Sequence, residues 1–234
     1  MLYSGLNQHN SNLREHQIEA KGKIFDAWDK YDSVMLQMPT GTGKTYLFTS
    51  IINDLLAAYK KAHHDIHILV VAHRMELLDQ ISATLSRFGI AHGIIQGSRE
   101  QLLWKRVQVA SIMSLLTEKN YYNTLRQKFD YIIVDEAHHS LADTYIKLFE
   151  LFPDAKKLGV TATPWRLNHE SFLKLYQALI ISPQISWFIN NNLLADFDYV
   201  SIKPDSDIQR LVDRSEVVDT GQYFQHPAHT LKVV

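Results

Sequence analysis

The sequence predicts an α/β fold in three layers, with helices on both faces of a mostly parallel β-sheet. Short runs rich in Val, Ile and Leu alternate along the chain with longer stretches of helical periodicity. Runs such as 66–71 and 131–134 are apolar at almost every position, which is typical of strands that are covered on both faces. Repeated alternation of strands and helices predicts right-handed crossovers between parallel strands.

The elements expected along the chain follow from these two patterns. Strands are expected where apolar and β-branched residues cluster, at 34–38, 66–72, 90–95, 107–110, 131–135 and 157–161, with weaker candidates near 179–181 and 199–203. Helices are expected where apolar residues recur every three or four positions, at 13–28, 45–60, 75–88, 112–118, 145–152 and 184–191.

Composition narrows the class of protein further. Hydrophobic residues make up 46% of the 234 residues and charged residues 21%, which excludes disorder, collagen and coiled coil as the overall class. The absence of cysteine excludes disulfides, cysteine-ligated zinc and thiol catalysis. We found neither an apolar run of the ~18 residues that a spanning helix needs nor a secretory signal. We therefore expect a cytoplasmic protein with no membrane partner, and at a formal charge of −1 any nucleic-acid contact must come from a local cluster.

The strongest local signal is a glycine-rich turn between an expected strand and an expected helix. It consists of Pro39, Thr40, Gly41, Thr42, Gly43, Lys44 and Thr45. Glycines let backbone N–H groups turn toward phosphate oxygens, the lysine would reach the β- and γ-phosphates, and the last threonine would ligate Mg²⁺. The strict pattern has a glycine where this chain has Met38. A plain glycine turn is the alternative, but the Gly-Lys-Thr ending before a helix favours a nucleotide site.

A second signal is the acid pair Asp135 and Glu136 at the carboxyl end of the strand 131–135. Ligands of open α/β sheets bind at that edge. Asp135 would hold Mg²⁺ and Glu136 would orient and deprotonate an attacking water. Acids at a helix N-terminus are the alternative interpretation. The adjacent His138 and His139 do not share a helix face, so polar contacts are favoured over a metal pair.

Together these segments resemble the superfamily-two helicases and translocases, with Asp-Glu-Ala-His at 135–138 similar to their second, DEAH-type motif. Other motifs of the family follow in the same order: 13–17 resembles the adenine-recognising segment, 71–80 motif Ia, 109–112 motif Ib and 159–164 motif III. The residues around 161–166, 182–183 and 193–196 are most similar to bacterial DNA translocases, such as repair helicases of the RadD kind and restriction-enzyme motor subunits.

This resemblance implies a RecA-like P-loop domain over residues 1–200, the first motor domain of an ATP-dependent helicase or translocase that favours DNA. It implies ATP and Mg²⁺ as cofactors, with Lys44 and Glu136 as catalytic residues. Residues 201–234 would then connect to a second RecA-like domain outside this chain, which would supply an arginine finger. Without that domain we expect weak nucleotide binding and very slow hydrolysis.

Other residues acquire expected roles from the same resemblance. Gln17 would hydrogen-bond the adenine edge, with Arg14 supporting it. His138, Thr161 and Thr163 would couple the state of the γ-phosphate to movement of the strand-binding surface. A solvent-facing Gln17 is the alternative, and strand-end and turn chemistry is the alternative for the threonines.

Contacts with the nucleic-acid backbone are expected from four residues: Arg74, Gly97, Ser111 and Arg166. Arg74 opens a helix after a strand, where its guanidinium and free N–H groups can meet one phosphate. An ion pair with Glu76 or Asp79 is the alternative for Arg74.

Two further clusters have ordinary structural explanations. His63, His64 and His67 have a spacing that can bind metal, but a polar loop is favoured. The aromatic residues Trp187, Phe188, Phe197 and Tyr199 could stack on bases, yet packing against the sheet needs fewer assumptions.

Three other functions stay open at this point. A DEAH-type RNA helicase would use the same motifs. A kinase or transferase would use the same glycine-rich loop with a small-molecule acceptor, and a regulatory module would bind nucleotide without turnover.

Overall fold

The computed structural model describes residues 3, 6–96, 102, 104–115, 117, 128–139, 143–163, 175–196 and 232–233. The strands are β1 (Ser33–Gln37), β2 (Ile68–Ala72), β3 (His92–Ile95), β4 (Val107–Ser111), β5 (Tyr131–Asp135), β6 (Lys156–Thr161), β7 (Ala178–Ile181) and β8 (Lys232–Val233). The helices are α1 (Glu15–Trp28), α2 (Lys44–Lys61), α3 (Met75–Arg87), α4 (Ile112–Leu115), α6 (Asp143–Leu151), α7 (Ile185–Asn190) and the short 3-10 helix η1 (Ala137–His139).

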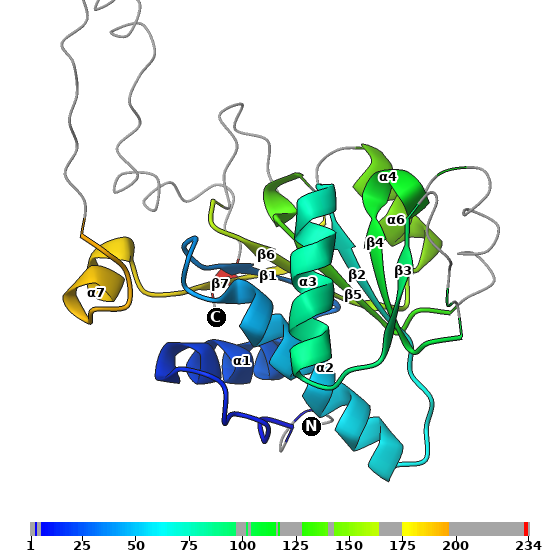
Figure 1. Cartoon of the computed structure of the whole chain (residues 1–234), viewed down its shortest axis with the longest axis horizontal. Helices are drawn as coiled ribbons and strands as arrows, with labels where there is room; N and C mark the ends of the chain where they lie inside the picture. Colours follow the sequence, from blue (N-terminus) through cyan, green and yellow to red (C-terminus); the bar gives the residue numbers. More distant parts are fainter. Residues whose placement is uncertain are drawn as a thin grey trace, which may run out of the picture.

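The described strands form one sheet in the order β3-β4-β2-β5-β6-β1-β7-β8, and every pairing in it is parallel. Helices α1, α2 and α3 cover one face, and α4 and α6 lie on the other (Figure 1). The predicted three-layer α/β architecture is confirmed.

The two apolar faces of the central strands explain why their sequences are apolar throughout. Successive strand residues point to opposite faces, so Val34 and Leu36 pack under α1 and α2, while Met35 packs in the cluster beside α6. In β2, Val70 and Val71 divide between the same two clusters. A polar position on either side would have to bury a group without water, which is costly.

A buried ion pair joins α1 to α2, the helix that follows the glycine-rich turn. The Nζ atom of Lys21 lies 2.6 Å from Oδ2 of Asp54, and both side chains are almost fully buried. Lys21 also donates to Ser50, and Asp54 accepts the backbone N–H groups of Gln8 and His9. These charge-assisted contacts fix the start of the chain and α1 against α2.

Element boundaries differ from the expected ones for local reasons. Helix α1 begins at Glu15 because Arg14 is extended and its backbone N–H donates to the side-chain oxygen of Gln17. Strand β3 begins at His92 because the N–H of Ile90 still bonds to Leu85 at the end of α3. Strand β8 pairs with β7 inside the range expected to be a connector, and the expected strand 199–203 lies outside the described residues.

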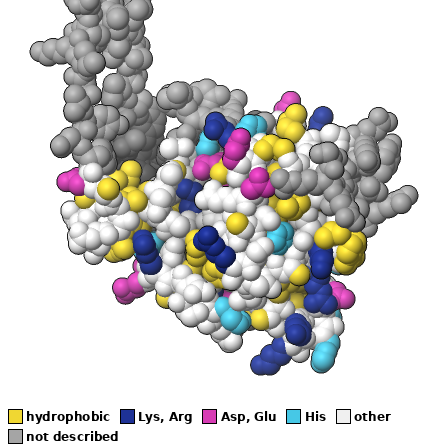
Figure 2. All heavy atoms as spheres, viewed as in Figure 1, with side chains coloured by type: hydrophobic (Ala, Val, Ile, Leu, Met, Phe, Trp, Pro, Cys, Tyr) yellow, Lys and Arg dark blue, Asp and Glu magenta, His cyan; other side chains and the backbone are white. Residues whose placement is uncertain are grey.

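The surface is mixed in charge on the face that α1, α2 and α3 form. Figure 2 shows Lys, Arg, Asp, Glu and His side chains interspersed over it. Among the helices that the structure describes, none combines the length and apolar character that crossing a bilayer requires.

Candidate active site

The order of the strands brings the glycine-rich turn and the acid pair together at the carboxyl ends of the parallel strands. Strands β1 and β5 both flank β6, with Gln37 opposite Thr161 and Asp135 opposite Val160. Neighbouring strands are ~4.8 Å apart, so the ends of β1 and β5 are separated by about 10 Å. The backbone N–H of Met38 donates to the carbonyl of Thr161 at 2.8 Å, which continues the pairing into the turn.

The glycine-rich turn has a left-handed backbone at both of its glycines. Gly41 and Gly43 adopt positive φ angles of 83° and 90°, and Gly43 directly precedes α2. The hydroxyl of Thr42 donates to the carbonyl of Pro39 at 2.6 Å, which closes the turn from within. Thr40 and Gly41 are exposed at its tip, while Thr45 is half-buried in the first turn of α2. The N-terminus of an 18-residue helix adds partial positive charge at this point.

Lys44 folds back over the loop. Its Nζ atom donates to the carbonyl oxygens of Met38 and Pro39 at 3.3 and 3.5 Å, and the residue is 8% exposed. Burial lowers the pKa of Lys44, and the negative charges of Glu136 and Asp135 oppose that shift. The ammonium group therefore lies within electrostatic reach of both acids, with neutral carbonyls as its direct partners.

The surroundings of Asp135 disfavour the charged form of its carboxyl group. It is 5% exposed at the end of β5, and burial together with the charge of Glu136 raises its pKa to about 6. The backbone N–H of Glu136, at 3.0 Å from Oδ1, and the more distant Lys44 only partly offset this. A divalent cation beside Asp135 would restore its ionised form, so the residue fits the role of a metal ligand.

The side chain of Glu136 contacts His138, which in turn bonds to Thr161. Its φ angle is 52°, in the left-handed region, and its Oε2 atom lies 3.2 Å from Nδ1 of His138. The same Nδ1 lies 3.1 Å from the hydroxyl of Thr161. Thr161 accepts the backbone N–H of Thr163 at 3.2 Å and donates to its carbonyl at 3.1 Å. Residues 136–138 of the DEAH-type motif and residues 161–163 of motif III are thus joined in one network of polar contacts.

Gln17 braces the phosphate loop in this structure. Its side-chain N–H₂ group donates to the carbonyls of Thr42 and Gly43 at 3.0 and 3.1 Å, and its oxygen accepts the N–H of Arg14 at 2.8 Å. A Cβ atom at position 43 would lie 2.3 Å from the side-chain nitrogen of Gln17. The contact between Gln17 and adenine stays a prediction, as does the supporting role of the exposed Arg14.

The structure describes two of the four residues expected to contact nucleic acid, and both lie at the same carboxyl ends of the strands. Arg74 is exposed at the start of α3, and Ser111 ends β4 with 4% exposure. Ala72 and Ser111, the last residues of β2 and β4, are register partners, so Arg74 follows the strand beside the one that Ser111 ends. Gly97 and Arg166 lie outside the described residues, as do the aromatic residues at 197 and 199.

Sequence reasoning missed one neighbour of the loop, the segment 184–196 that contains α7. A Cβ atom on Gly41 would lie 3.1 Å from Cδ2 of Leu194, and the His16 ring lies 4.9 Å from that of Phe188. His16 also places Nε2 3.3 Å from the carbonyl of Thr42. No local signal links residues so distant in sequence, apart from the aromatic run in α7.

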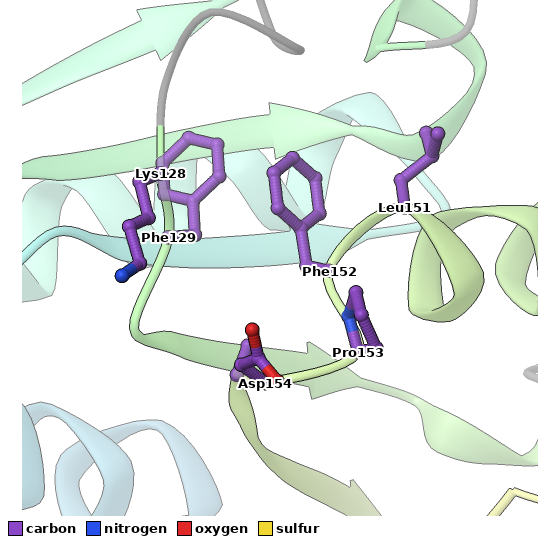
Figure 3. Close-up of a pocket in the computed structure, with 7 residues that line it drawn as sticks. Lys128, Phe129, Leu151, Phe152, Pro153 and Asp154 are labelled. Carbon is purple, nitrogen blue, oxygen red and sulfur yellow. The ribbon is translucent and has the colours of Figure 1, made fainter.

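Two remaining features lie apart from this site. A shallow hollow of about 200 Å³ lies at the amino ends of β5 and β6, away from the carboxyl ends where the site lies (Figure 3). It is lined by Lys128, Phe129, Leu151, Phe152, Pro153, Asp154 and Ala155. Within the part of the chain that the structure describes, no group of three or more His, Asp or Glu side chains is arranged to hold a metal ion, including the histidines 63, 64 and 67.

The chain is similar in sequence to several known proteins. A 51.5 kDa protein of a Lactococcus phage is 34% identical over 177 residues, which are 76% of this chain and 34% of that protein. The putative ATP-dependent helicase IRC3 of Saccharomyces cerevisiae is 28% identical over 200 residues, 81% of this chain and 28% of that protein. This chain therefore spans about a third of the length of the curated relatives that it matches.

Among solved structures, the type ISP restriction-modification enzyme LlaGI in complex with a DNA substrate mimic matches with a TM-score of 0.61. The match has 17% sequence identity and covers 87% of this chain and 22% of that chain. A family model for the type III restriction enzyme, res subunit, matches residues 10–166. The chain therefore belongs to the family of the type III restriction enzyme res subunit, with the RecA-like motor domain of superfamily-two helicases and translocases.

Proposed function

We propose that this chain is the ATP-hydrolysing motor domain of a DNA-dependent helicase or translocase. One observation carries the proposal: the glycine-rich loop after β1 and the acid pair at the end of β5 flank the end of β6. Lys44 begins α2 directly after the loop, and the negative charges of Glu136 and Asp135 raise its pKa against the effect of burial. A triphosphate on the loop would place its terminal phosphate between these groups.

The loop and Lys44 would bind the phosphates. The positive φ angles at Gly41 and Gly43 are those with which a loop can turn backbone N–H groups toward an anion, and the N-terminus of α2 would add its partial positive charge. Lys44 would exchange its carbonyl partners Met38 and Pro39 for phosphate oxygens, a change from neutral to charged acceptors. This interaction stabilises charge that develops on the β- and γ-phosphates during transfer.

Asp135 and Thr45 would hold Mg²⁺. The buried carboxyl has too little positive charge around it, and the hydroxyl lies in the first turn of α2 beside Lys44. When bound, Mg²⁺ supplies positive charge against the β- and γ-phosphate oxygens.

Glu136 would orient the attacking water and accept its proton. His138, which also bonds to Thr161, contacts the carboxylate of Glu136, and this carboxylate is half-buried. The water oxygen bonds to the γ-phosphorus as the bond to the β,γ-bridging oxygen breaks, which yields ADP and phosphate. The contact of Thr161 with His138 offers a route from this event to Thr163 at the surface.

The preference for DNA over RNA draws support from the solved LlaGI complex, which contains a DNA substrate mimic. Arg74 and Ser111 would contact the phosphate backbone, which reads charge and shape rather than sequence. A second RecA-like domain, outside this chain, would complete the site with an arginine finger, worth about 10³–10⁵ in rate in other nucleotide hydrolases.

The experiment that tests this proposal uses the full-length protein that contains this chain. ATP hydrolysis is measured with Mg²⁺ alone and then with single-stranded DNA, duplex DNA or RNA. We expect DNA to stimulate hydrolysis above RNA, and Lys44→Ala to abolish it. Equal stimulation by RNA would favour an RNA helicase, and ATP binding without turnover in any condition would favour a regulatory module.

A further inference from the structure

Segment 184–196 lies against the phosphate loop on the side away from β6. Leu194 approaches Gly41 so closely that a Cβ atom there would lie 3.1 Å from Cδ2 of the leucine. Figure 1 shows α7 at the same end of the sheet as the loop between β1 and α2. Strand β7 pairs with β1 on the side opposite β6, so this segment and the acid pair lie on opposite sides of the loop.

An aromatic anchor holds the segment in place. Phe188 is fully buried and meets the His16 ring edge-on, with ring centres 4.9 Å apart. The backbone N–H groups of Leu193 and Leu194 donate to the carbonyl of Phe188 at 2.8 and 3.3 Å, which turns the chain back toward the loop. Burial lowers the pKa of His16, and its Nε2 atom lies 3.3 Å from the carbonyl of Thr42, an oxygen that can only accept a hydrogen bond.

Trp187 is the part of this anchor that is open to ligand. It is 40% exposed, and its ring centre lies 6.1 Å from that of His16 at an angle of 70°. Its ring also lies edge-on to that of Phe188, with ring centres 5.2 Å apart, so one side of the indole packs on the anchor while the rest faces solvent. Gln17, in contrast, uses both side-chain N–H bonds on the carbonyls of Thr42 and Gly43.

We propose that Trp187 and Leu194 form an apolar wall for the base and ribose of the nucleotide whose phosphates bind the glycine-rich loop. This inference rests on the proposed function and names the part of the site that recognises the nucleoside. With the terminal phosphate facing the acid pair, the base leaves the loop on the other side, where α7 lies. Stacking on an aromatic ring tolerates any base, so this wall supplies affinity more than selectivity.

The test compares two ligands that share phosphates and differ in the nucleoside. Binding of ATP and of inorganic tripolyphosphate, each with Mg²⁺, is measured by calorimetry for the wild-type chain and Trp187→Ala. The variant is expected to bind ATP about 5- to 150-fold more weakly, the range that stacking of a base supports. Tripolyphosphate should bind within about twofold of the wild type, since its contacts lie on the loop.

Two matched variants control for indirect effects. Trp104, 70% exposed before β4, is an exposed tryptophan away from the loop, so Trp104→Ala should leave the ATP to tripolyphosphate affinity ratio unchanged. Trp187→Phe keeps an aromatic face and should recover most of the ATP affinity that Trp187→Ala loses.

The inference is overturned if Trp187→Ala binds ATP as tightly as the wild type, or weakens both ligands equally. A loss of DNA binding with unchanged ATP binding would assign Trp187 to the nucleic acid instead and would also overturn it. Failure of the proposed nucleotide site has a different signature, because the wild-type chain would then bind neither ligand and Lys44→Ala would change neither affinity.

Discussion

Oε2 of Glu136 lies 3.2 Å from Nδ1 of His138, and that same nitrogen lies 3.1 Å from the hydroxyl of Thr161. Glu136 follows β5 and Thr161 ends β6, so a single imidazole joins two adjacent strands. The proposed general base therefore cannot move without disturbing the hydroxyl that also bonds to Thr163.

The first prediction concerns this three-residue network. His138→Ala and Thr161→Val should each reduce DNA-stimulated ATP hydrolysis by the full-length protein, while the dissociation constant for ATP changes little. Since both variants break the same connection, the double variant should be no slower than the more damaged single one, with a coupling energy of about 0.5–3 kcal/mol. Additive losses would show that His138 and Thr161 act independently.

The second prediction separates binding from chemistry at Glu136. Glu136→Gln keeps the shape of the side chain and removes its basicity, so ATP should bind normally while turnover falls by at least about 10²-fold. Single-turnover hydrolysis and equilibrium binding of a fluorescent ATP analogue measure the two quantities on one protein sample. Hydrolysis at the parent rate would mean that Glu136 is not the base.

The third prediction concerns the free energy of unfolding and its dependence on pH. The pKa of Asp135 is about 6 in the folded chain against an ordinary value of 3.8, so between these pH values the folded state binds more protons than the unfolded state. Stability must then fall as pH rises through that window, by about 2–3 kcal/mol for a buried carboxyl. Asp135→Asn should therefore be more stable than the wild type at pH 7 without Mg²⁺.

Urea unfolding at pH 7 and pH 4 measures this difference. The advantage of Asp135→Asn should shrink at pH 4, where the wild-type carboxyl is mostly protonated in the folded state. The exposed Asp154 provides a control, and Asp154→Asn should change stability by less than about 0.5 kcal/mol at either pH. A variant less stable than wild type at pH 7 would contradict the burial argument.

Local patterns predicted the sheet and the two chemical motifs because each depends on nearby residues. A strand buried on both faces must be apolar at every position, as at 131–134, and a loop that turns N–H groups outward needs glycine where Gly41 and Gly43 stand. The resulting motif positions at the ends of β1 and β5 are those that the structure places beside β6.

Contacts set by strand order could not be predicted in this way. Leu194 meets Gly41 because β7 pairs beside β1, and nothing in either segment encodes that pairing. The family resemblance likewise implies a contact between Gln17 and adenine, but could not show that the amide of Gln17 bonds to the loop carbonyls. Side-chain amides have several suitable acceptors, and only the packing of α1 against the loop selects among them.

The fourth prediction concerns the proposed nucleic-acid edge. Arg74→Ala should weaken binding of single-stranded DNA and lower the slope of log affinity against log salt by about one, because one phosphate contact is lost. ATP binding without DNA should stay near the wild-type value, since Arg74 lies at α3 and not at the loop. Equal losses of both affinities would place Arg74 in a structural role.

The fifth prediction uses two glycines with similar backbones and different surroundings. Gly43 and Gly89 have φ angles of 90° and 70°, so alanine at either position suffers backbone strain of about 1–2 kcal/mol. At Gly43 the new Cβ would also lie 2.3 Å from the side-chain nitrogen of Gln17, whereas at Gly89 nothing lies within 4 Å. Gly43→Ala should therefore destabilise the chain more than Gly89→Ala and should weaken nucleotide binding as well, because Gln17 must leave the loop carbonyls.

Urea unfolding of both variants, and of Gly43→Ala combined with Gln17→Ala, measures the effect. The combined variant should lose less stability than the sum of its two single changes, and strict additivity would show that Gln17 does not brace the loop.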